Sequence, residues 1–190
     1  MGSVESLTNV KKIVENINEP VVVVVSALGG ITDRLIRTSQ LAVAGDDNYR
    51  NEFDAMVDRH HGIIDAVIPA GAAHDTLKAK VDALLDELRS IYHGVYLIRD
   101  MTQKTANVIV SYGERMSSQI VSAFIEGSQC YDSREFIKTV RKQNRNLVDF
   151  DVTIRLVIQT FARMPRIAVV PGFIASDAND GETTNLGRGG

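Results

Sequence analysis

The C-terminal segment Thr183–Gly190, with the sequence TTNLGRGG, holds the residue best suited to bind an anion. Arg188 stands among glycines that provide no side-chain cover, so its guanidinium is suited to bidentate binding of a carboxylate or phosphate. We favour this role for Arg188 over a structural one. The segment is not a Walker nucleotide-binding loop, because no Gly-Lys-Ser/Thr follows it.

A second polar turn, Ser26–Thr32, directly follows a run of valines. The backbone N–H groups of Gly29 and Gly30, with the hydroxyls of Ser26 and Thr32, could face an anionic substrate above a sheet. The alternative is a plain strand-to-helix turn, in which glycine supplies a positive φ and Thr32 caps the helix. Taken alone, the turn favours this alternative.

Glu114 is the third candidate, because it follows Gly113 at the expected start of a helix. A carboxylate at that position commonly compensates the helix dipole. The functional alternative is a carboxylate that receives the ammonium group of a substrate. The sequence leaves both interpretations open.

The remaining polar groups predict no metal site. Residues 177–182 miss the ligand spacing of a calcium loop, so we expect a solvated turn or hairpin. His60 and His61 are adjacent and would point in different directions on a helix, which indicates packing or surface histidines. Cys130, the single cysteine, is expected to be a small buried side chain.

The elements that must position these groups alternate between strand and helix. Val21–Val25 and Ile167–Val170 are β-branched runs without polar alternation, typical of strands that are covered on both faces in a parallel sheet. Residues 129–132 predict a short strand, and Asp132 with Glu135 has the spacing of a capping box. Apolar residues three and four positions apart predict helices over 4–17, behind a Ser3 cap, and over 33–44, 48–67, 77–91, 116–124 and 151–162. This order predicts an α/β fold, a three-layer αβα sandwich with a mostly parallel sheet.

Composition sets the broad class. A chain of 190 residues with 44% hydrophobic and 24% charged residues suits one globular domain, here residues 1–190. The net charge of −3 offers no broad positive field for nucleic acid or an anionic membrane. No apolar run approaches the roughly 18 residues of a membrane span, no export signal precedes the first helix, and the lone cysteine suits a reducing compartment. We therefore expect a cytoplasmic protein that binds neither nucleic acid nor membrane.

Four motifs in the same order resemble those of the aspartokinases. They are VVVVSALGGITD at 22–33, SYGERMS at 111–117, DSRE at 132–135, and GFIAS at 172–176 followed by TTNLGRGG at 183–190. Together they extend over most of the chain, which makes the resemblance much more specific than any single glycine-containing turn.

The resemblance implies the amino-acid-kinase fold and ATP-dependent phosphorylation of the β-carboxylate of L-aspartate, the first step toward lysine, threonine and methionine. It also implies use of ATP and Mg²⁺ by the complete enzyme, and a homo-oligomer. Arg188 would hold the α-carboxylate of aspartate, Glu114 would recognise its ammonium, and the Gly29-Gly30 turn would lie near the transferred phosphoryl group. The aspartate site implied in this way comprises Ser26, Thr32, Glu114, Phe173 and Arg188.

Two departures from the family pattern matter. Aspartokinases open with Lys-Phe-Gly-Gly-Thr-Ser, whereas this chain opens with Met1-Gly2-Ser3, and they continue past the glycine pair into Ser-Asp and an ATP-binding half. We therefore expect an incomplete amino-acid-kinase domain with little kinase activity of its own. Two alternatives stay open: a non-catalytic aspartate-binding or regulatory module, and a related kinase acting on glutamate, carbamate or a nucleotide. Fusion to homoserine dehydrogenase is also left open.

Overall fold

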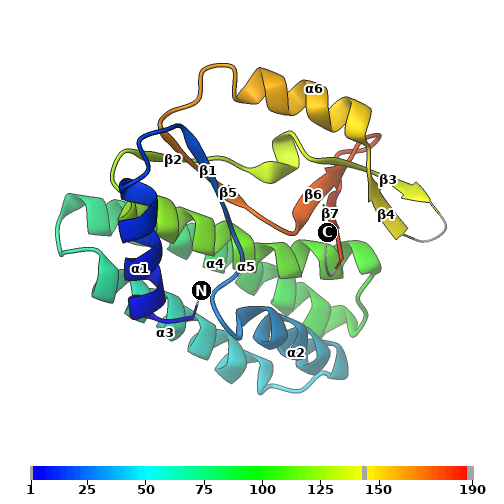
Figure 1. The fold of residues 1–190 in the computed structure, drawn as a ribbon. Coiled ribbons are helices and arrows are strands. Elements are labelled where there is room, and N and C mark those ends of the chain that lie inside the picture. The colour runs from blue at the N-terminus through cyan, green and yellow to red at the C-terminus, as the bar shows by residue number, and fades with distance from the viewer. Residues whose placement is uncertain (1, 143–144, 188–190) are drawn as a thin grey trace.

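The computed structural model describes residues 2–142 and 145–187, which form helices packed against two small sheets (Figure 1). The helices are α1 (Val4–Glu15), α2 (Ile31–Ala44), α3 (Tyr49–Val67), α4 (Ala72–Ile98), α5 (Gln103–Phe124), the 3₁₀ turn η1 (Ser133–Glu135) and α6 (Phe150–Thr160). The strands are β1 (Val21–Val25), β2 (Ser128–Cys130), β3 (Lys138–Lys142), β4 (Arg145–Val148), β5 (Ile167–Pro171), β6 (Ile174–Asp177) and β7 (Thr183–Asn185).

The first sheet is parallel and has the order β1-β5-β2. Its central strand β5 is buried along its whole length, as a β-branched strand between two neighbours should be. The second sheet has the order β4-β3-β6-β7, in which β3 and β6 are parallel and the two outer pairs are antiparallel. Because β5 leads through a short turn into β6, the carboxyl ends of the parallel strands lie next to the second sheet.

Helices α2, α3, α4 and α5 form a thick layer on one side of the strands, and α6 lies on the opposite side (Figure 1). The core joins this layer to the parallel sheet, with Leu35, Met56, Leu88 and Ile109 among its fully buried side chains. The structure therefore confirms the expected helix–sheet–helix layering. It also confirms the Ser3 cap, since Ser3 and Ser6 form a reciprocal capping box.

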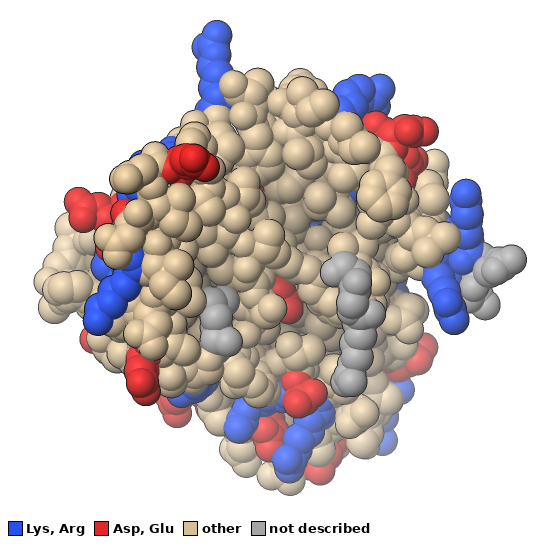
Figure 2. Space-filling view, in the orientation of Figure 1, with Lys and Arg blue, Asp and Glu red and all other residues tan. Residues whose placement is uncertain are grey.

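The prediction that β1 is covered on both faces is wrong. Val22 is 43% exposed and Val24 is 67% exposed, while Val25 is buried. The physical reason is that β1 is the edge strand of its sheet, so it has a neighbouring strand on one side only, whose side chains could shield Val22 and Val24. Helix α6 exposes apolar residues as well, including Phe150 and Ile158, and the surface over the strands and α6 carries few charged side chains (Figure 2).

We expect the chain to self-associate through this exposed apolar face, because an uncharged edge strand and exposed valines favour pairing with another copy. Val24→Lys should shift the population toward monomer in sedimentation velocity, since the ammonium opposes burial of this face. Leu97→Lys is the matched control, because Leu97 lies on α4 and is 65% exposed. Equal effects of the two substitutions would contradict association through β1.

Candidate functional site

Glu114 lies in the middle of α5, which runs without interruption from Gln103 to Phe124. The expectation that Glu114 stands at a helix start is therefore wrong, and so is the dipole-compensating interpretation. The N-terminus of α5 is capped instead by Thr102, whose hydroxyl accepts a hydrogen bond from the Thr105 N–H. The position of the Glu114 carboxylate in the middle of a helix therefore has to be explained by contacts other than the helix dipole.

The environment of Glu114 is unusual for a carboxylate. Only 4% of the residue is exposed, Oε1 accepts a 3.4 Å hydrogen bond from the Ala27 N–H, and Oε2 is buried without a partner. Burial raises the pKa of Glu114 to about 7, against the lowering effect of the backbone hydrogen bonds from its own N–H and that of Ala27. Because an unpaired buried carboxylate is costly, this side chain is poised to receive a cationic group.

The turn after β1 supplies the partner of Glu114. Ser117, one helical turn further along α5, donates a 2.7 Å hydrogen bond to the Ser26 carbonyl. Gly113 permits this approach, because a Cβ at that position would lie 2.8 Å from Ala27 Cβ. Contacts from Gly113, Glu114 and Ser117, which span little more than one turn of α5, thus fix the segment 26–27 against the helix.

The start of α2 differs from the sequence prediction in one respect. Gly30, with φ of +80°, is the N-cap residue of α2, and no side chain caps this helix. Thr32 is therefore not the cap, since it already lies inside α2 and is half-buried there. Ser26, Gly29 and Gly30 are exposed at the carboxyl end of β1, where backbone groups and a hydroxyl are accessible to a ligand.

The turn between β5 and β6 reaches the same place. The Gly172 N–H donates a 2.8 Å hydrogen bond to the Val25 carbonyl, and a Cβ on Gly172 would lie 3.0 Å from Val24 Cγ1. Phe173 has a left-handed backbone with φ of +64°, and its carbonyl accepts a 2.9 Å hydrogen bond from the Leu186 N–H. Such a backbone conformation in a bulky residue is rare and is typical of functional sites.

The structure therefore gathers segments that are distant in sequence: the turn 26–30, the Glu114–Ser117 stretch of α5 and the turn at Phe173. Arg188 and the glycine pair after it lie outside the described residues. Ser117 was not among the predicted site residues. The spacing in Gly-Glu-x-x-Ser could have found it, because positions three apart share one face of a helix.

The two adjacent histidines and residues 177–182 behave as the sequence predicted, whereas Cys130, expected to be buried, is only partly buried. His60 is fully buried with Nδ1 2.7 Å from the Met56 carbonyl, and His61 pairs with Asp82. Residues 177–182 form the β6–β7 hairpin turn, in which Asp177 accepts a hydrogen bond from the Asn179 N–H. Among residues 2–142 and 145–187, no group of three or more His, Cys, Asp or Glu side chains could hold a metal ion. In the same ranges no helix is long and apolar enough to cross a membrane.

Comparison with known proteins gives a consistent result. The model of the amino acid kinase family matches residues 1–190. Among curated proteins, the chain is 29% identical to the chloroplastic bifunctional aspartokinase/homoserine dehydrogenase 1 of Zea mays, over 97% of this chain and 21% of that protein. It is 24% identical to chloroplastic aspartokinase 1 of Arabidopsis thaliana, over 100% of this chain and 35% of that protein.

Solved structures share the fold. E. coli aspartokinase III in complex with aspartate and ADP superposes with a TM-score of 0.85 at 23% identity, covering 100% of this chain and 42% of that one. The aspartate kinase of Clostridium acetobutylicum gives a TM-score of 0.78 at 17% identity, covering 100% and 40%. The chain spans between 21% and 42% of the length of these relatives.

Proposed function

Because the chain belongs to the amino acid kinase family, we propose that it forms the aspartate-binding part of an aspartate kinase. The reaction is transfer of the γ-phosphoryl group of ATP to the β-carboxylate of L-aspartate, giving 4-phospho-L-aspartate. The observation that carries the proposal is the buried Glu114 carboxylate with one unpaired oxygen, facing the turn at the carboxyl end of β1. The names of the curated relatives, and the aspartate and ADP bound to the E. coli protein, support the choice of substrates.

Each candidate residue has a role that its chemistry suits. Glu114 receives the ammonium of aspartate, because its free oxygen lacks a donor inside the protein. Ser26 and Thr32 offer hydroxyls, and Phe173 lies at the strained turn beside the end of β1. Arg188 binds the α-carboxylate, and the exposed Gly29-Gly30 turn lies near the transferred phosphoryl group.

Phosphoryl transfer to a carboxylate requires few catalytic groups from this part of the protein. A β-carboxylate is ionised near pH 7, so it attacks phosphorus without a general base. The chain's contribution is then to orient that carboxylate in line with the phosphoryl group and to exclude water. Mg²⁺ would accompany ATP in this proposal and would offset the negative charge of its phosphates.

Three further properties stay proposals. ATP binding is inferred from the ADP complex of the E. coli relative. The homo-oligomer is supported by the exposed apolar face of β1. A cytoplasmic location rests on the lone cysteine, which suits a reducing compartment, whereas the plant relatives are named as chloroplastic proteins.

The pH dependence of binding tests the proposed role of Glu114. Since the pKa of Glu114 is about 7 and only the carboxylate attracts ammonium, lowering the pH from 8 to 6 should weaken L-aspartate binding about tenfold. Calorimetric titration gives the dissociation constants. Succinate, which lacks the amino group, is the control and should not lose affinity in this way. Equal pH profiles for the two ligands would exclude an ammonium at Glu114.

Arg188→Ala tests the other end of the substrate. Loss of the guanidinium should weaken L-aspartate binding by at least about tenfold, because an ionic hydrogen-bonded contact is removed. Arg163→Ala is the matched control, since Arg163 is an exposed arginine in the loop before β5. An unchanged affinity in Arg188→Ala would leave Arg188 without its proposed role.

A further inference from the structure

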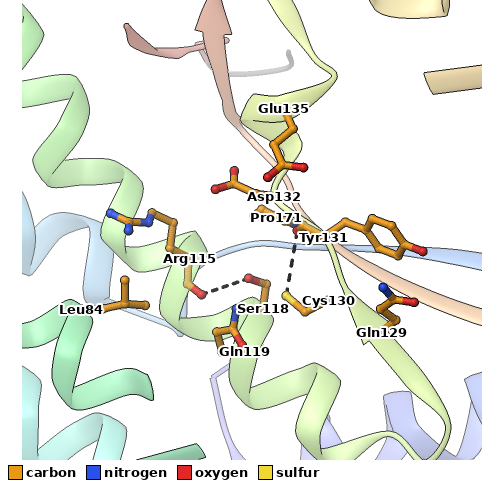
Figure 3. A pocket seen from close by; sticks show the side chains of 10 residues that line it. All are labelled: Leu84, Arg115, Ser118, Gln119, Gln129, Cys130, Tyr131, Asp132, Glu135 and Pro171. Atoms are coloured by element: carbon orange, nitrogen blue, oxygen red, sulfur yellow. Dashed lines mark hydrogen bonds between the residues drawn. The ribbon is translucent and has the colours of Figure 1, made fainter. Parts of the chain in front are cut away.

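A second recess opens at the same edge of the parallel sheet, on the other side of α5. It is a pocket of about 440 Å³, within the range of roughly 300–1,000 Å³ typical of small-molecule sites. Figure 3 shows its walls: one turn of α5, the end of β2 with the segment after it, and single residues from α4 and β5. None of the candidate aspartate-site residues lines it.

Helix periodicity separates the two sites. Glu114 and Ser117 contact the turn after β1, whereas Arg115 and Ser118, each one position later, line the second pocket. Neighbouring positions on a helix point in directions about a quarter-turn apart, so α5 forms a wall between the two sites. The second pocket is thus a separate site and not an extension of the first.

Arg115 is the cation of this pocket. Its side chain is 17% exposed, it donates a 3.4 Å hydrogen bond to Glu87, and its guanidinium lies 4.3 Å from the centre of the Tyr112 ring. A guanidinium has five N–H donors, so these contacts fix its plane and leave donors for a ligand. A carboxylate is the group that matches such a fork.

Two acidic residues, Asp132 and Glu135, line the pocket together with Arg115, and they differ in whether a basic side chain already binds them. Asp132 is bound by the guanidinium of Arg134, at 2.9 Å from Nε to Oδ1 and 2.5 Å from Nη2 to Oδ2. Burial raises the pKa of Asp132, but this ion pair outweighs that effect and lowers it. Glu135 is exposed at the pocket rim and has no ion pair in the described part of the chain. After these pairings, Arg115 keeps guanidinium donors beyond its contact with Glu87, and Glu135 is the carboxylate of the pocket lining without an ion pair in the described part of the chain.

The segment that carries Glu135 is held firmly in place. The Arg134 carbonyl accepts hydrogen bonds from Lys138 Nζ at 2.8 Å and from Ser176 Oγ at 2.7 Å. The Ser133 hydroxyl donates a 2.8 Å hydrogen bond to the Ile174 carbonyl. A site built on such a fixed turn loses little conformational entropy when a ligand binds.

We propose that this pocket binds a compact zwitterion of the α-amino acid type. Its carboxylate would lie on Arg115 and its ammonium near Glu135, while Leu84 and Pro171 offer apolar surface to a side chain. The proposal stands apart from the proposed function, because it uses none of the residues assigned to L-aspartate.

L-Leucine is a suitable probe, because two analogues share its side chain and each lacks one of its two charged groups. 4-Methylpentanoate lacks the amino group, and 3-methylbutylamine lacks the carboxylate. In ¹H–¹⁵N spectra of the folded chain, L-leucine should shift the amide signals of Ser118, Gln129 and Tyr131, and those of Gly29 and Gly30 should move little. Each single-charge molecule should bind at least tenfold more weakly.

Variants locate the two charges. Arg115→Gln and Glu135→Gln should each weaken L-leucine binding at least tenfold, whereas the exposed controls Arg163→Gln and Glu126→Gln should not. Arg115→Gln could disturb the packing around Tyr112. Glu135 is exposed, so Glu135→Gln should leave the fold intact and tests the site independently.

The Glu114→Gln variant separates this proposal from the previous one, since it should lose L-aspartate and keep L-leucine. The proposal is overturned if neither L-leucine nor glycine shifts the pocket signals at millimolar concentration. It is overturned equally if 4-methylpentanoate binds as tightly as L-leucine, which would indicate a simple anion site on Arg115.

Discussion

Glu114→Gln is expected to weaken L-aspartate binding by roughly 30-fold or more, which corresponds to about 2 kcal/mol or more for removing one partner of a buried ionic contact. The same substitution should make the folded chain more stable at pH 8. Both effects have one cause, because the carboxylate that attracts a ligand is a buried charge with one oxygen, Oε2, that has no hydrogen-bond partner.

The direction of the stability effect follows from the shift in pKa. Folding raises the pKa of Glu114 from 4.5 to about 7, so the folded chain favours the protonated acid. Its stabilising contribution is complete below pH 4.5 and is lost as the pH rises through 7. At pH 8 the ionised side chain therefore costs up to about 3 kcal/mol, which a neutral amide of similar size avoids.

Denaturant unfolding at pH 5 and pH 8 measures this difference, and calorimetry measures the affinity for L-aspartate. Glu126→Gln is the control, since Glu126 is an exposed glutamate just after α5. If Glu114→Gln were no more stable than the parent chain at pH 8, the buried charge could not be the cause of the raised pKa.

Local patterns in the sequence were sufficient to predict many of the helices and strands of the fold. The valine run and the 3.6-residue periodicity predicted β1 and the helices α1, α2, α3 and α6 close to their observed limits, because these elements are specified by residues near one another in the chain. Strands β3, β4, β6 and β7 were not predicted. They are short and partly polar. The pairs β3–β4 and β6–β7 are local hairpins, and they join into one sheet because distant segments pair, as Lys138 does with Ser176.

The candidate site was predicted by residue type and not by geometry. Gly-Glu-x-x-Ser drew attention to Glu114, but Gly113 suggested a helix start, whereas the structure shows a continuous helix. What the sequence could not reveal is that the absent side chain at Gly113 is needed for a tertiary contact. The raised pKa of Glu114 has the same origin, since burial depends on how α5 packs against the turn after β1.

Gly113→Ala is therefore expected to reduce both stability and L-aspartate binding. The new Cβ would lie 2.8 Å from Ala27 Cβ and 3.3 Å from Leu35 Cδ1, so α5 and the turn after β1 must move apart. Overpacking of this kind costs about 1–3 kcal/mol. The displacement also separates Glu114 from the Ala27 N–H and from the ligand it faces, so affinity should fall with stability.

Gly62→Ala separates this effect from helix propensity. Gly62 lies inside α3, and apart from its two chain neighbours and the nearby backbone of α3 itself no atom lies within 4 Å of the position its Cβ would take. Alanine there should stabilise the chain by up to about 1 kcal/mol, because glycine is the poorer helix former, and should leave L-aspartate binding unchanged. The same gain in propensity is available at Gly113. If alanine lowers the free energy of unfolding at Gly113 but raises it at Gly62, the difference measures the close contact between α5 and the turn after β1. If alanine raises it at both positions, no such contact holds Glu114 in place.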